Sequence, residues 1–243
     1  SNSVNPLDEK DDALKLTITD IYNKKRDELS HSLQNLNEGI AITQISINGL
    51  INQQNNLKNI ENSLIKLENS GDYEANRFDT ANEISIELNS YNEQAQNATY
   101  KKRSLLNDQY GDEVINIVTP SKNFLLKGLN TKEISQNLVN NLSTNTLSSS
   151  ENIKNAIDNT MEALSNSLAF SDDYTKIQNE MKQTARTTLN EQLNLLKENS
   201  KLKDSNFGTD INDFSKTSIS SNLGHLAASQ AHIIQEQSSK LLA

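Results

Sequence analysis

The chain of 243 residues has no cysteine and no tryptophan, and it has only seven glycines and two prolines. Without cysteine it can form neither a disulfide nor a thiolate metal site. So few glycines and prolines argue against a fold of short strands and tight turns. Aromatic residues make up 5% and hydrophobic residues 34% of the chain. This composition disfavours a compact globular core and favours long helices joined along narrow apolar seams.

Basic clusters and long apolar runs are also missing. The formal net charge of −9 disfavours binding to nucleic acid or to an anionic membrane, because both need a basic face. No run approaches the ~18 apolar residues of a membrane span, and residues 1–10 lack the basic and apolar regions of a signal peptide. His225 and His232 have no third ligand beside them, and phosphate-loop and nucleophile motifs are absent. We therefore expect no membrane or nucleic-acid partner, no metal, no cofactor and no enzymatic activity.

Apolar residues recur with helical spacing through most of the chain. From about Asp8 to Ser70 they predict one long helix, or two in near-continuous line, and one heptad row holds Leu36, Leu50, Leu57 and Leu64. Gly39 and Gly49 inside this helix indicate a bend or a close helix contact. The sequence Ser-Gly-Asp at 70–72 is a stop and restart signal, so a second helix is expected over 73–98.

β-branched residues, a glycine and a proline mark 99–130 as the segment expected to form strands. A short helix near 132–142, a polar linker over 143–150, a long helix to about 199 and a charged joint at 201–208 follow. The sequence therefore predicts a mainly α fold: an elongated antiparallel bundle of long helices with a small β-hairpin region at about 99–130. Residues 1–200 form this helical domain, and the chain is expected to turn over at the β region before it returns.

The last predicted element, residues 209–243, is an amphipathic helix at the carboxyl end of the sequence. Its apolar residues recur mainly at three- and four-residue steps among polar ones. Such a stripe either folds back on an earlier element or is buried by another molecule, and the second option makes the chain part of an assembly. The stripe consists of Phe214, Ile219, Leu223, Leu226, Ile233, Ile234, Leu241 and Leu242.

Four stretches, in the same order, resemble the bacterial flagellins. They are Lys10–Ala13 with Leu16 and Ile18; Asn37–Gln44 with Gly49 and Leu50; Thr99–Tyr100 with Leu105–Asp108; and Asp213–Lys216 with Gly224, Ser229–His232 and Leu241–Leu242. The flagellin turn in the third stretch carries Asn-Gly, and this chain has Lys101 and Lys102 there. Flagellins place some forty to fifty residues before the first stretch, so the resemblance implies that an amino-terminal helix is missing from this sequence. The variable outer domains common in the family have no room here.

The resemblance implies a rod domain and a structural subunit of the flagellar filament, which assembles with other flagellin subunits through terminal helices and serves motility. It implies export by the flagellar type III route, without a cleaved signal peptide, to the extracellular filament. In flagellins an export chaperone also grips the carboxyl-terminal helix, so Phe214 to Leu242 is the expected polymerisation or chaperone site. Flagellins recognised by the animal innate-immune receptor present an Arg and a Leu where this chain has Asn59 and Ser63. We expect this hot spot to be lost and receptor activation to be weak or absent.

Three alternatives stay open from the sequence. A junction protein between hook and filament shares the helical ends of flagellins. A small flagellin-like protein secreted as an effector fits the missing outer domain. From another class, a helical adaptor of a secretion system would resemble flagellin only by accident.

Overall fold

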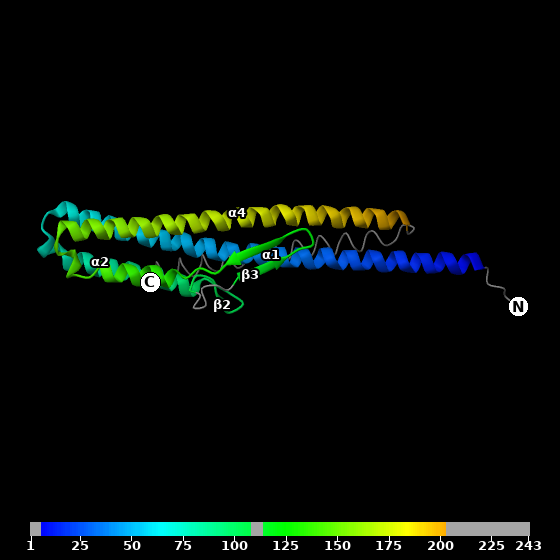
Figure 1. Ribbon diagram of the computed structural model, residues 1–243, viewed down its shortest axis with the longest axis horizontal. Coiled ribbons are helices and arrows are strands. Elements are labelled where there is room, and N and C mark those ends of the chain that lie inside the picture. Colours follow the sequence, from blue (N-terminus) through cyan, green and yellow to red (C-terminus); the bar gives the residue numbers. More distant parts are fainter. Residues whose placement is uncertain (1–5, 108–113, 203–243) are drawn as a thin grey trace, which may run out of the picture. The chain divides into compact units, whose positions relative to one another are not determined.

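The computed structural model describes residues 6–107 and 114–202, which form a mainly α fold with long helices. The helices are α1 (Pro6–Ser70), α2 (Tyr73–Asn97), α3 (Thr131–Asn141) and α4 (Ser150–Leu202), with a 3₁₀ turn, η1 (Thr146–Ser148), before α4. The strands are β1 (Thr99–Tyr100), β2 (Arg103–Ser104), β3 (Val114–Val118) and β4 (Asn123–Lys127). Figure 1 colours the chain along the sequence and labels α1, α2, α4, β2 and β3. The prediction of long helices with a small β-hairpin region is confirmed, and the predicted segment 209–243 lies outside the described residues.

The boundary between α1 and α2 falls at the predicted stop and restart signal. The Ser70 hydroxyl donates to the Leu67 carbonyl at 2.7 Å, and Gly71 has a φ of +67°, a left-handed conformation that glycine adopts without steric cost. The Asp72 carboxylate then accepts a hydrogen bond from the Ala75 N–H at 3.1 Å and caps α2. Ser70–Asp72 therefore makes the first reversal of the chain.

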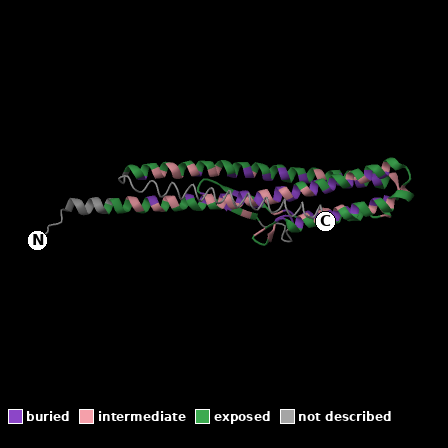
Figure 2. Cartoon of the chain, turned by 180° about the vertical axis from the view of Figure 1, so that it is seen from behind, coloured by how far each residue is buried: buried purple, intermediate pink, exposed green. Residues whose placement is uncertain are grey.

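Two compact units are distinguished within the described residues. The first contains residues 6–38, 118–122 and 182–202, and the second contains residues 39–107, 114–117 and 123–181. Buried and exposed residues alternate along the helices, as expected where each helix packs along one side (Figure 2).

In the second unit the core follows the heptad seam that the sequence predicted. Leu36 belongs to the first unit, while Leu50, Leu57 and Leu64 lie here, and all four are fully buried. One cluster joins the end of α1 to α2, α3, η1 and the start of α4, and includes Leu57, Ile60, Leu64, Leu67, Ile84, Leu88, Tyr91, Leu138, Leu147, Ile153 and Ala163. A second joins α1 to the end of α2, the loops beside the hairpins and α4, and consists of Ile47, Leu50, Ala95, Ala98, Leu106, Leu129 and Tyr174.

The two clusters add a reversal to the expected path. The end of α1 packs against the start of α2, and Ile47 and Leu50 pack against the end of α2, so the two helices are already antiparallel. The chain thus reverses first at Ser70–Asp72. It reverses again through the β region, because Ser135 of α3 bonds to Asn92 of α2 and Arg77 of α2 bonds to Thr144 after α3, so α2 and α3 are antiparallel.

Gly39 and Gly49 lie where side chains of neighbouring segments approach α1 closely, and α1 is continuous through both. A Cβ on Gly39 would lie 2.5 Å from the Met181 sulfur, and one on Gly49 would lie 2.6 Å from Cδ1 of Leu106. A Cβ at either position would therefore force the Met181 or the Leu106 side chain to shift.

The first unit has a simpler arrangement. The Gln192 amide donates to the Ser30 hydroxyl at 2.9 Å and so joins α4 to α1, and the Asn35 amide donates to the Val118 carbonyl at 3.0 Å. Tyr22 and Leu29 are buried. The turn after β3 is closed by the Thr119 N–H, which donates to the Lys122 carbonyl at 3.2 Å.

Candidate functional site

The predicted polymerisation or chaperone site lies outside the described residues. Its members are Phe214, Ile219, Leu223, Leu226, Ile233, Ile234, Leu241 and Leu242, and their assignment stays a prediction. His225 and His232 also fall there. Among the residues that the structure describes, no group of three or more His, Asp or Glu side chains could hold a metal ion. No helix within 6–107 or 114–202 is long and apolar enough to cross a membrane.

Asn59 and Ser63 lie on α1 of the second unit, on the side that faces α2. The Asn59 amide donates to the Glu87 carboxylate at 3.2 Å, and the Ser63 hydroxyl donates to Glu83 at 2.9 Å. Asn56, one turn earlier, donates to the other Glu87 oxygen at 2.7 Å. This row of bonds, which we call the α1–α2 polar ladder, joins neutral donors to carboxylates. The loss of the immune-receptor hot spot remains a prediction.

The electrostatics around the ladder come mainly from α2. That helix carries one cation, Arg77, against the carboxylates Glu74, Asp79, Glu83, Glu87 and Glu93. An arginine introduced at position 59 would therefore meet an acidic neighbour, Glu87.

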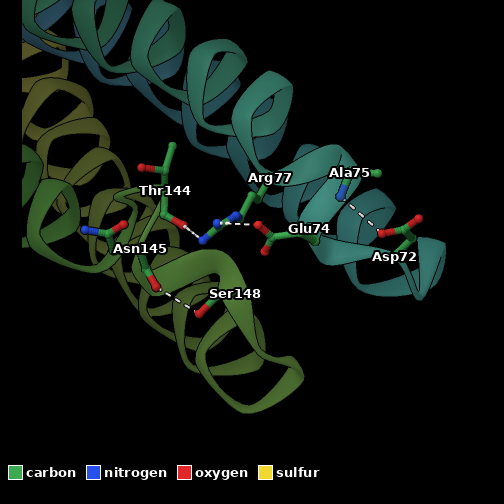
Figure 3. Close-up of polar contacts among 7 residues, drawn as sticks. All are labelled: Asp72, Glu74, Ala75, Arg77, Thr144, Asn145 and Ser148. Atoms are coloured by element: carbon green, nitrogen blue, oxygen red, sulfur yellow. Dashed lines mark hydrogen bonds and ion pairs between the residues drawn. The ribbon is translucent and has the colours of Figure 1, made fainter.

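Arg77 also holds the end of the second unit together (Figure 3). Its guanidinium donates to the Thr144 carbonyl at 3.2 Å and to the Glu74 carboxylate at 2.8 Å, and it lies 5.0 Å from the ring centroid of Phe78. One side chain thus connects α2 to the segment before α4. On the neighbouring end of α1, a hydrogen bond from the Ser150 hydroxyl to Glu68 at 2.5 Å lowers the pKa of that carboxyl, and Lys154 at 3.5 Å adds to the effect.

The hairpins rest on a buried tyrosine of α4. The Tyr174 hydroxyl donates to the Lys127 carbonyl at the end of β4. Burial raises the pKa of Tyr174 to about 12, although the Arg103 guanidinium acts in the opposite direction. Burial likewise raises the pKa of Tyr91, and the nearby Thr131 acts in the opposite direction. These groups stay protonated at neutral pH and serve packing.

Sequence reasoning missed the buried amides that join α1 to α4. The Gln54 amide donates to the Ser171 hydroxyl at 2.7 Å and to the Ser167 carbonyl at 3.2 Å, and the Gln178 amide donates to Gln44 at 3.1 Å. Gln54 and Gln178 are almost fully buried. A signal was present, because Gln54 follows Ile47 by seven residues and so continues a row of the predicted seam.

Comparison with known proteins gives the fold a counterpart. No protein-family model matches the chain, and no curated protein matches it. A solved structure from Vibrio parahaemolyticus, provisionally described as a flagellar hook-associated protein, is similar with a TM-score of 0.62 and 12% sequence identity. The match covers 81% of this chain and 98% of that one. At this identity the likeness shows a shared fold.

Proposed function

We propose that this chain is a structural subunit of the bacterial flagellum, of the flagellin type, and that it assembles with other subunits to build the filament. The observation that carries the proposal is the fold likeness, which spans almost the whole of a chain described as flagellar hook-associated. The four flagellin-like stretches support it, because they occur in the order that the family has. The proposal includes assembly and chaperone binding through Phe214 to Leu242, export without a cleaved signal peptide, and no catalytic role.

The same likeness favours a second candidate, a hook–filament junction protein. The solved structure is described as hook-associated rather than as a flagellin, and the match covers 98% of its chain. Filament and junction subunits differ in where they are found along the flagellum, so position decides between them.

Immunogold electron microscopy of the source bacterium, with antibody against the purified chain, tests both candidates. The filament proposal expects label along the whole filament, and loss of the filament and of swimming when the gene is deleted. Label confined to one point near the cell would favour the junction protein. Intact filaments without label, with the protein found in the medium only when the flagellar export apparatus is present, would favour the secreted effector. Secretion that does not depend on that apparatus would favour the secretion-system adaptor.

A second test is seeded assembly of the full-length protein, with its native amino terminus, on flagellar fragments. Ordered filaments in the microscope are the expected result. A matched variant carries Leu223→Glu and Leu226→Glu in the predicted polymerisation site. It should remain folded and fail to assemble, because each substitution places a charge on the stripe that assembly is expected to bury.

A further inference from the structure

We draw no further inference here: the strongest candidate, the exposed apolar strip of Ile51 and Ile65 on α1 with Met161 and Leu168 on α4 of the second unit, carries none because nothing in the structure shows what covers it.

Discussion

At the scale of single residues, the β1–β2 turn combines a tight loop with an unfavourable sequence. Lys101 and Lys102 connect the pairs Thr99–Ser104 and Tyr100–Arg103, and both lysines have positive φ, +47° and +67°. Two-residue hairpin loops of this kind favour Asn-Gly, because a side chain with a Cβ is strained there. This chain has lysine at both positions, yet it adopts the left-handed conformation there.

Restoring the favoured turn residues should therefore stabilise the protein. Lys101→Asn with Lys102→Gly is expected to raise the free energy of unfolding by about 1–2 kcal/mol, because it removes left-handed strain at two positions. Chemical unfolding followed by circular dichroism measures the change. Lys122→Asn, in the turn after β3, serves as a control for the loss of a lysine. An unchanged or lower free energy of unfolding in the double variant would mean that the left-handed conformation of the two lysines does not destabilise the protein.

Tyr174 makes the stability sensitive to alkaline pH. Its folded pKa of about 12 lies above the ordinary value of 10.0, so the folded protein keeps a proton that the unfolded chain loses. Stability is therefore unaffected below about pH 10 and falls as the pH rises through the window from 10 to 12. Tyr91 acts in the same direction.

Tyr174→Phe separates this effect from packing. It should cost about 1 kcal/mol at neutral pH, because the hydrogen bond to the Lys127 carbonyl is lost. Above pH 10 its stability should fall less steeply than that of the parent. Urea unfolding at a neutral and an alkaline pH gives the free energy of unfolding of each protein under both conditions. If that free energy falls equally with pH in the variant and the parent, this phenol does not control alkaline unfolding.

At the scale of elements, the buried Gln54 joins α1 to α4 by hydrogen bonds where the seam would otherwise hold a leucine. Gln54→Ala should destabilise by about 1–3 kcal/mol, because it leaves a cavity and removes the partner of two buried serines. Gln54→Leu should cost much less, since it fills the space and the Ser167 and Ser171 hydroxyls can bond to their own helix. Thr43 and Thr160 already donate in this way, to Gly39 and Ala156.

Thermal unfolding of the two variants beside the parent measures this difference. Equal losses for Ala and Leu would mean that the amide itself, rather than the filling of the seam, stabilises the α1–α4 contact.

The long elements were predictable because their signals are local. Helix spacing, the glycine at position 71 and the aspartate cap at 72 fix where α1 ends and α2 begins. The α1–α2 polar ladder and the Gln54 contacts could not be predicted from the sequence, since they depend on which helices become neighbours when the chain folds. Exposure of Ile51 and Met161 was equally invisible, because a heptad row does not say which side another helix will cover.

At the scale of the whole molecule, the expected immune-receptor hot spot lies on α1, whereas the predicted assembly and chaperone site falls in residues 209–243. Asn59 and Ser63 occupy the expected hot-spot positions, and both are bonded to carboxylates of α2. Without an arginine to anchor a partner, the purified full chain should give weak or no signal in receptor reporter cells. Strong signalling at nanomolar concentration would contradict the alignment of these positions with the family's hot spot.

A variant designed to gain receptor signalling is the more demanding test. Asn59→Arg with Ser63→Leu should raise the signal above that of the parent, but only partly, because Glu87 lies beside position 59 and would pair with the new guanidinium. Adding Glu87→Gln should release that arginine and raise the signal further. Lys58→Arg with Asn62→Leu, one residue away on the same helix, provides a control that should stay at the level of the parent. If the control signals as strongly as the test variant, arginine anywhere on this surface suffices and the assignment of positions 59 and 63 is wrong.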